Sequence, residues 1–429
     1  MPMRLDPVPR LTAALAPALL AAALAATLPA CTSEVVCAAN ETALDGRCIS
    51  LQSDPLNCGA IGRACAGGES CSAGLCCLGS QCPPAAYAAC FNTNALQGVT
   101  AAAVPVGAPL ALDEGGPIAF AWLGAELWVA NSMSNTLDRL SVSPAGLAPV
   151  VQLPTITIPA GAGFPDLEAL AGMDGFLYVA NAAVGSLVVV DTSLAPASAV
   201  VGEIQFGANS YPQGIAIQGG KAYVTLRGAN EIAVVDLATR TVAKRVSVSA
   251  LASAGASAMP GRIVITGSRA YAVLWNLDSL TNPYIWSPGG NGRLAVLDTA
   301  TDTLVAGASP VDLGPSCLNP AGLAVLGSTL WVTCGYQKYD PAVVQPFEGA
   351  SFVPVDLSGP LPVVGTPVAA GAYGPGPIAF CNGVGYAGDR YSGNLLRLDP
   401  ATRTVLGTSP VCPASAYGFA MVSDLACGR

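Results

Sequence analysis

The feature that most constrains the fold is a unit that repeats along the chain from Leu96 onward. Each unit starts with a short apolar segment and a turn containing Gly. A second apolar segment then ends in a small motif, such as LWVAN at 127–131 or LYVAN at 177–181. A third segment usually ends in Asp, and a Thr/Val-rich segment such as ATRTVAKRVSV closes the unit. Short apolar segments bounded by turn residues are typical of β-strands.

The spacing inside the unit is nearly constant. The interval from the aromatic residue of the second segment to the end of the third is 13 residues in four units: Trp128 to Ser141, Tyr178 to Asp191, Tyr223 to Asp236, and Tyr386 to Asp399. In two further units, Tyr271 to Asp298 and Trp331 to Asp356, insertions of 14 and 12 residues lengthen the same interval. Four strands in roughly 40–50 residues predict an all-β propeller of four-stranded blades. A solenoid of βα units would need helical periodicity, which is not visible.

The two ends of the repeat region predict how the ring closes. Six full units are visible, and one further first strand follows at Gly418 to Asp424. The segment from Val99 to Pro109 resembles outer strands that lack an inner partner. A seventh blade built from both ends of the region would remove open sheet edges. Six blades with frayed ends is the alternative.

The repeated residues have structural interpretations. Asp at the end of the third strand, in turns such as D-x-A-T-x-T, is expected to accept backbone hydrogen bonds. The aromatic residues of the second strands are expected to be buried in the core.

The units resemble the YVTN family of β-propellers, whose motif YVTN precedes a strand ending in VID-x-ATN-x-V. The nearest matches are YVAN at 178–181 and VVDLATRTV at 234–242, and the resemblance covers Gly116 to Val411. It implies the fold but not one activity, because propellers serve many roles.

The N-terminus has the features of an export signal. Residues 1–10 contain Arg4 and Arg10, and residues 11–30 form an Ala-rich apolar run. A positive start, an apolar centre and small residues at the end are typical of a secretory signal peptide. A retained transmembrane helix is the alternative.

The end of that run, LPAC at 28–31, resembles a bacterial lipobox, although Pro29 departs from the usual pattern. The resemblance implies cleavage before Cys31, a lipid on Cys31 and, with Thr32 next, attachment to the outer membrane. Such a lipid tethers a protein without spanning the bilayer. The expected organisation is therefore a signal peptide at 1–30, a cysteine-rich module at 31–84 and a propeller at 85–429.

The chain has 15 Cys residues, and in an exported protein these predict disulfides. Apart from Cys31, eight lie in a short segment and six are spread out, so that each group can close on itself. We expect a bridge between Cys317 and Cys334, at the same end of neighbouring strands, and clamping of the seam by Cys90 and Cys427. A Cys₄ zinc site in the short segment is the alternative. The eight are Cys37, Cys48, Cys58, Cys65, Cys71, Cys76, Cys77 and Cys82; the six are Cys90, Cys317, Cys334, Cys381, Cys412 and Cys427.

Residues 57–76 resemble the Stig1-like cysteine-rich repeat, with its CG-x-x-G-x-x-C-x-x-G-x-x-C run. Ile61 stands where that pattern often has another Cys, so the usual partner of that Cys needs a different thiol, for which Cys77 is a candidate. The resemblance implies a small adhesive module; a spacer that lifts the propeller off the membrane is the alternative.

Composition removes several kinds of chemistry. The chain has no His, which removes Ser–His–Asp and Cys–His mechanisms and imidazole ligands to zinc. Its net charge of −9 argues against nucleic acid as a partner. No D-x-D-x-D-G calcium loop is present. We expect no cofactor and no catalytic residue. A propeller enzyme of lactonase or lyase type, with a metal held by carboxylates, is the alternative.

The two insertions carry the predicted ligand- or partner-binding residues. They span 275–288 and 336–347 and emerge on the same face, and the next blade adds residues at the same relative position. Aromatic loops on a rigid scaffold suit peptides, glycans or envelope proteins. The predicted function is a non-enzymatic binding or scaffold protein of the cell envelope; a purely structural spacer is the alternative. The residues are Trp275, Asp278, Tyr284, Trp286, Tyr336, Tyr339, Asp340, Phe347, Arg390 and Tyr391.

Overall fold

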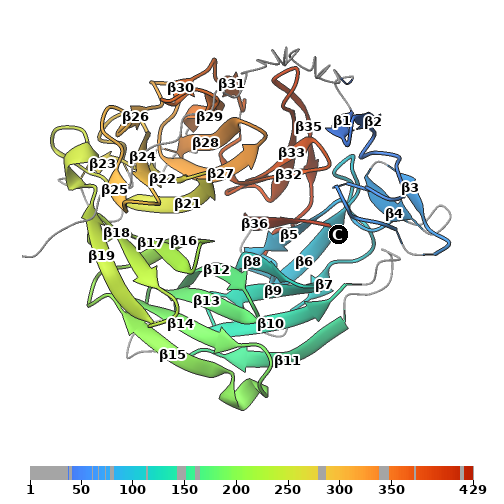
Figure 1. The fold of residues 1–429 in the computed structure, drawn as a ribbon, viewed down its shortest axis with the longest axis horizontal. Helices are drawn as coiled ribbons and strands as arrows, with labels where there is room; N and C mark the ends of the chain where they lie inside the picture. The colour runs from blue at the N-terminus through green and yellow to red at the C-terminus, as the bar shows by residue number, and fades with distance from the viewer. Residues whose placement is uncertain are drawn as a thin grey trace, which may run out of the picture.

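Seven four-stranded β-sheets are arranged as blades around a central axis (Figure 1). The computed structural model describes residues 37, 41–59, 61–65, 67–72, 74–77, 82–112, 115–142, 151–159, 165–278, 287–337, 347–371, 373–415 and 420–428. The predicted all-β, seven-bladed propeller is confirmed, and the six-bladed alternative is wrong. The signal peptide and Cys31 lie outside the described residues.

Six blades each come from one continuous stretch of chain, and their strands are numbered outward from the axis. Blade 1 holds β8 (Pro117–Leu123), β9 (Glu126–Asn131), β10 (Thr136–Ser141) and β11 (Val151–Thr157). Blade 2 holds β12 (Leu167–Met173), β13 (Phe176–Asn181), β14 (Ser186–Asp191) and β15 (Val200–Gln205). Blade 3 holds β16 (Pro212–Gln218), β17 (Lys221–Leu226), β18 (Glu231–Asp236) and β19 (Thr241–Ser247).

The next two blades have a fourth strand that is split into two short pieces. Blade 4 holds β21 (Pro260–Thr266), β22 (Arg269–Leu274), β24 (Arg293–Asp298), β25 (Thr303–Leu304) and β26 (Val311–Asp312). Blade 5 holds β27 (Pro320–Leu326), β28 (Thr329–Gln337), β29 (Phe347–Asp356), β30 (Val363–Val364) and β31 (Val368–Ala369). Blade 6 holds β32 (Pro375–Cys381), β33 (Val384–Asp389), β34 (Asn394–Asp399) and β35 (Thr404–Pro410). A small pair, β20 (Ala256–Ser257) and β23 (Leu277–Asp278), lies beside blade 4.

Blade 7 joins the two ends of the repeat region. Its inner strand is β36 (Val422–Cys427), which pairs with β5 (Ala86–Cys90), followed outward by β6 (Ala95–Val99) and β7 (Leu110–Ala111). The outer strands were expected at 99–109, but they begin earlier. The segment AYAAC lacks the Val/Thr pattern of the other blades, and its burial by neighbouring blades rather than its local propensity makes it a strand.

The core consists of apolar layers between neighbouring blades, because second and third strands are covered on both faces. Successive side chains of a strand point to opposite faces, so Leu127 and Val129 pack toward blade 7 while Trp128 packs toward blade 2. The six second-strand aromatic residues are buried, as predicted: Trp128, Tyr178, Tyr223, Tyr271, Trp331 and Tyr386.

The aspartates that end third strands act as turn residues, as expected. Asp236 accepts hydrogen bonds from the backbone and the hydroxyl of Thr239, and Asp298 does so from Thr301. Asp191, Asp356 and Asp399 likewise accept backbone N–H groups two residues ahead. Hydrogen bonds from hydroxyl groups, such as that of Ser193 to Asp191, and from the backbone N–H groups of these turns lower the pKa of all five carboxyl groups.

The last residue of the second-strand motif fastens the loop that leads into an inner strand. In blade 2 the Asn181 side chain donates to the Pro159 carbonyl at 3.2 Å. In blade 5 the same position is Cys334, bonded to Cys317, which confirms the predicted bridge. In blade 7 it is Cys90, bonded to Cys412 in the entering loop. The motif therefore has a structural role.

A third propeller disulfide joins inner strands of two blades. Cys427 of β36 is bonded to Cys381 of β32, so blade 7 is held to blade 6 at two places. Cys90 and Cys427 both clamp the seam, as expected, each through a partner in or just after blade 6.

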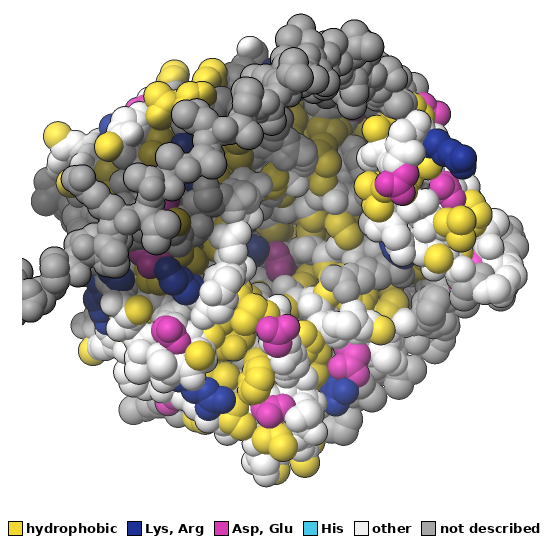
Figure 2. Space-filling model, viewed as in Figure 1, with side chains coloured by type: hydrophobic (Ala, Val, Ile, Leu, Met, Phe, Trp, Pro, Cys, Tyr) yellow, Lys and Arg dark blue, Asp and Glu magenta, His cyan; other side chains and the backbone are white. Residues whose placement is uncertain are grey.

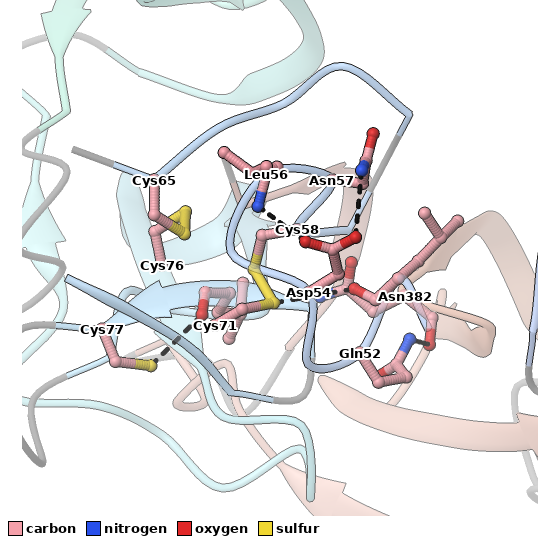
Figure 3. Close-up of a disulfide and its surroundings, with 12 residues drawn as sticks. Gln52, Asp54, Leu56, Asn57, Cys58, Cys65, Cys71, Cys76, Cys77 and Asn382 are labelled. Atoms are coloured by element: carbon pink, nitrogen blue, oxygen red, sulfur yellow. Dashed lines mark hydrogen bonds between the residues drawn. A yellow bond between two sulfur atoms is a disulfide. The ribbon is translucent and has the colours of Figure 1, made fainter. Parts of the chain in front are cut away.

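The cysteine-rich module closes on itself with four disulfides and packs against blade 6 (Figure 3). The bridges are Cys37–Cys48, Cys58–Cys71, Cys65–Cys76 and Cys77–Cys82. Cys77 thus pairs with the nearby Cys82. The sulfur atoms of Cys58, Cys65 and Cys76 lie within 4.8 Å of one another, but as disulfide sulfurs they are not thiolate ligands. The module's strands are β1 (Thr42–Leu44), β2 (Arg47–Ile49), β3 (Ser70–Ser72) and β4 (Leu75–Cys77).

Asn382, in the turn between β32 and β33, is the contact point for the module. The Gln52 side chain donates to the Asn382 carbonyl at 3.4 Å. A Cβ on Gly74 would lie 2.8 Å from the Asn382 side chain, so a glycine is needed there for the two parts to meet.

Candidate ligand site in the central channel

The two faces of the ring differ in which connections they carry. Turns between second and third strands share one face with the loops that enter the inner strands, which we call the loop face. Turns between first and second strands, including that of Asn382, lie on the opposite face. The central hollow of the ring contains both acidic and basic side chains (Figure 2).

Four polar side chains from inner strands line a cavity of about 100 Å³ in this hollow. They are Glu168 of β12, Gln213 of β16, Arg262 of β21 and Asp424 of β36. Glu168, Gln213 and Arg262 each lie where the pairing register shifts at the start of the strand. Such a bulge turns a side chain away from the regular alternation. The bulges therefore let mostly apolar inner strands present polar groups to the channel.

Arg262 and Asp424 form a bridge between blades 4 and 7. An Arg262 Nη atom lies 2.8 Å from an Asp424 carboxylate oxygen, and the other Nη donates to the Ser423 carbonyl at 3.2 Å. The second carboxylate oxygen of Asp424 accepts the Phe120 backbone N–H of blade 1 at 2.8 Å. The bridge thus couples three blades around the axis.

Glu168 lines the cavity, and the pKa of its carboxyl group lies well above the ordinary value. Its carboxylate accepts a hydrogen bond from the Gln213 amide at 2.5 Å. Burial and, second, the neighbouring Asp166 raise the pKa of Glu168 to about 7, against the opposing effects of Arg227, Gln213 and Arg262. Burial also raises the pKa of Asp166, opposed by Arg227 and by the Ser132 hydroxyl at 3.4 Å.

Arg227 connects these carboxyl groups to two aromatic rings on the loop face. Its guanidinium carbon lies 5.5 Å from the ring centre of Tyr211 and 5.4 Å from that of Trp275. Both distances are within cation–π range. A Cβ on Gly261 would lie 2.6 Å from the Trp275 indole nitrogen, so the indole lies against the backbone of β21. We call Tyr211, Asp166, Glu168, Gln213, Arg227, Arg262, Trp275 and Asp424 the channel site.

The predicted site residues occupy several different places. Trp275 belongs to the channel site. Arg390 occupies the corresponding position in blade 6, where it packs against Gly376 of the inner strand and donates to the Gly335 carbonyl at 2.8 Å. Tyr391 is 45% exposed, with the Arg390 guanidinium 5.7 Å from its ring centre. Asp278 lies in β23, paired with Ala256.

The remaining predicted residues belong to the long insertions. Tyr336 and Phe347 lie in the extended ends of β28 and β29, where the backbone of Tyr336 pairs with Glu348 and that of Phe347 with Gln337. Tyr284, Trp286, Tyr339 and Asp340 lie outside the described residues.

The sequence contained a signal for the missed residues. Arg227 directly follows the second strand of its blade, at the same repeat position as the predicted Trp275 and Arg390. Glu168 and Gln213 each follow the first residue of an inner strand. Charged or amide side chains at these two repeat positions stand out among the small or apolar residues of other units, such as Ala182, Gly335, Gly261 and Ala321. Comparing the units position by position would have revealed them.

Comparisons with known proteins match the two parts of the chain separately. The model of the stigma-specific STIG1-like protein family matches residues 25–79. A search of curated proteins found no match. Among the described residues no helix is long and apolar enough to cross a membrane. The seven disulfides indicate an exported protein of an oxidising environment.

Solved structures share the propeller fold at low sequence identity. A protein from Lactobacillus plantarum has a TM-score of 0.56 and 12% identity, over 80% of this chain and 99% of that one. Hydrazine synthase of Kuenenia stuttgartiensis has a TM-score of 0.53 and 17% identity, over 73% and 90%. Virginiamycin B lyase from Staphylococcus aureus has a TM-score of 0.50 and 14% identity, over 72% and 93%. These likenesses show the fold alone.

Proposed function

We propose that this protein is an exported lipoprotein of the cell envelope whose propeller binds a ligand or partner at the channel site without converting it chemically. The observation that carries the proposal is the convergence of Glu168, Gln213 and Arg262 on one cavity. Apart from these three, Asp424 and Gln218, the inner strands carry apolar or small side chains. A cavity with a few convergent polar groups is the usual form of a ligand site.

The aromatic residues of the loop face support a partner that approaches from that side. Trp275 and Tyr211 flank Arg227, and Tyr211 is 39% exposed. Aromatic side chains with one wet edge are enriched where proteins bind partners. The inserted loops that carry Trp286 and Tyr339 begin and end on the same face and would extend this surface.

The test is a binding screen with the full chain carrying Cys31→Ser, against peptides, glycans and envelope proteins. For a ligand so identified, Arg227→Ala and Trp275→Ala should each weaken binding about tenfold or more, because each removes a central contact. The control is Arg245→Ala, which removes a surface arginine paired with Glu231 on blade 3. Unchanged affinity in both channel variants would exclude the channel site. Trp286→Ala and Tyr339→Ala test whether the inserted loops share it.

The membrane attachment is tested separately. The lipobox resemblance supports a lipid on Cys31, and Thr32 after it supports an outer-membrane location. Labelled fatty acid should be incorporated into the natural chain but not into Cys31→Ser, and only the natural chain should fractionate with outer membranes. Label in the variant, or its absence from both chains, would contradict this attachment.

An enzyme is the second candidate, because an acid with a pKa of about 7 in a cavity suits general acid–base catalysis. In that case Glu168→Gln should abolish turnover of a bound ligand while leaving its binding largely intact. Recovery of every bound ligand unchanged from the natural protein supports the binding role.

A further inference from the structure

The charges around Glu168 do not balance within the site. Asp166, Glu168 and Asp424 supply three carboxyl groups, while Arg227 and Arg262 supply two guanidinium groups. Arg262 is committed to Asp424 by the 2.8 Å ion pair. Arg227 is therefore left to face both Asp166 and Glu168. Among the described groups around Glu168, the carboxyl groups therefore outnumber the guanidinium groups by one.

The hydrogen-bonding capacity that is still unused around Glu168 belongs to acceptor atoms. The Gln213 amide donates its N–H to Glu168, and its carbonyl oxygen is buried without a partner. Each carboxylate has room for more than one donor. Two carboxylates and one amide oxygen match the three N–H donors of a primary ammonium group.

We infer that the channel site receives a lysine side chain of a partner protein or peptide, whose ammonium group is held by Glu168, Asp166 and Gln213. This inference rests on the proposed ligand-binding function and names the ligand's chemistry. The methylene stem would lie beside Tyr211 and Trp275 at the loop face, where aromatic rings cover aliphatic chains.

The size of the cavity favours lysine over other sources of an amine. An engineered cavity of roughly 150 Å³ is filled by one benzene ring. The channel cavity, at about 100 Å³, is smaller than that space, so the bulkier ring of an amino sugar could not enter it fully. The four-carbon stem of lysine is narrow and carries its charge at the end, so it can enter a space of this size.

Binding of the ammonium group should displace the proton on Glu168. The pKa of this carboxyl group is about 7, whereas a lysine ammonium stays charged well above that pH. Affinity should therefore rise with pH up to about 7 and level off beyond it, falling about tenfold for each pH unit below. A neutral ligand would show no such dependence on Glu168.

The experiment is calorimetric titration of the Cys31→Ser chain with Nα-acetyl-lysine methylamide, between pH 5.5 and 8. At pH 8, Glu168→Gln should weaken binding about tenfold or more, whereas at pH 5.5 the natural and variant proteins should bind almost equally. Gln213→Leu should weaken binding but retain the pH dependence. Glu231→Gln, which alters a surface glutamate paired with Arg245, should leave both unchanged.

The comparison ligands separate the outcomes. The Nε-acetyl form of the probe has the same stem without the charge and should not bind. The inference is overturned if the lysine probe does not bind, if both probes bind equally, or if glucosamine or phosphoethanolamine binds more tightly. If the screen has meanwhile found another ligand sensitive to Arg227→Ala, the proposed function stands and only the lysine inference falls.

Discussion

Blades 2 to 4 and blades 5 to 7 form the two sides of the same ring but are built differently. Among the described residues, every propeller strand that carries a disulfide-bonded cysteine belongs to blades 5 to 7. The polar groups of the channel come mainly from blades 2 to 4, with Glu168, Gln213 and Arg262. The cysteine-rich module packs against the disulfide-bonded side through Asn382.

The two sides use the same repeated unit for different purposes. Blades 5 to 7 carry the stabilising disulfides, and blades 2 to 4 carry most of the polar groups of the channel. Position 334 holds a cysteine that fastens a loop, whereas the corresponding position in blade 4 holds Leu274, followed by the channel residue Trp275. Covalent clasps around the seam hold blade 7 in place. The opposite side, which contains no disulfide among its described residues, carries buried charges that cost folding energy.

The largest expected effect is on the disulfide-bonded side. Replacing Cys90 and Cys412 together by Ala removes a cross-link between residues 322 positions apart. The free energy of unfolding should fall by about 5 kcal/mol, because long loops lose the most entropy when cross-linked. Removing Cys317–Cys334, with a separation of 17, should cost about 3 kcal/mol. Denaturant unfolding measures both, and equal losses would contradict the special role of the seam.

The next effect concerns the bridge that joins the two sides. Arg262→Ala leaves the Asp424 side chain, only 9% exposed, without its cation. We expect a loss of about 3 kcal/mol in urea denaturation, since an unpaired buried charge is costly. Adding Asp424→Asn should recover part of that loss. A double variant no more stable than Arg262→Ala would show that the charge is not the cause.

A smaller effect concerns the pH dependence of stability, to which Glu168 of blade 2 should contribute. The pKa of Glu168 in the folded protein is about 7, above its ordinary value of 4.5, so the folded state binds the proton more tightly. Stability should therefore fall as the pH rises from about 4.5 through 7, by roughly 2 kcal/mol. Glu168→Gln should remove this contribution. Thermal unfolding of both proteins at pH 5 and 8 measures it; parallel pH profiles would contradict the assignment.

The smallest effect is expected at a surface turn common to both sides. Asp236→Ala removes hydrogen bonds to the backbone and hydroxyl of Thr239 and should lower the free energy of unfolding only slightly, because these bonds lie in a solvent-exposed turn, without affecting ligand binding. Asp298→Ala in the next blade, with the same bonds to Thr301, should cost the same. A change in channel binding in either variant would show that the turns are not purely structural.

The fold was predictable because its evidence is local and repeated. The 13-residue interval from Tyr223 to Asp236 reflects a hairpin of two strands, which sequence alone specifies. The bridge from Cys317 to Cys334 was predictable for the same reason. The strand at 86–90 was misplaced because its Ala-rich sequence has little strand propensity, and contacts with β36 and β6 make it a strand.

The channel site was largely missed because its contacts are not local. Arg262 meets Asp424 across 162 residues, and no pattern within one unit predicts that pair. Glu168 points inward because of a bulge, which breaks the alternation used to assign faces. Trp275 was found because an aromatic residue at the start of an insertion is visible without knowing its neighbours.

The pairing of β36 with β5 has a consequence for the timing of assembly. Blades 1 to 6 can each form as soon as their own stretch of chain is available, but the Ser423 hydroxyl meets the Ala89 carbonyl across 334 residues. Blade 7 must therefore wait until the chain of blades 1 to 6 and then β36 have been delivered to the compartment where it folds. During that delay Cys90 remains unpaired beside the eight cysteines of the module, because its partner arrives late. Correct oxidation thus depends on the module forming its four short-range bridges first, and an isomerase that repairs early mispairing should speed the maturation of this protein.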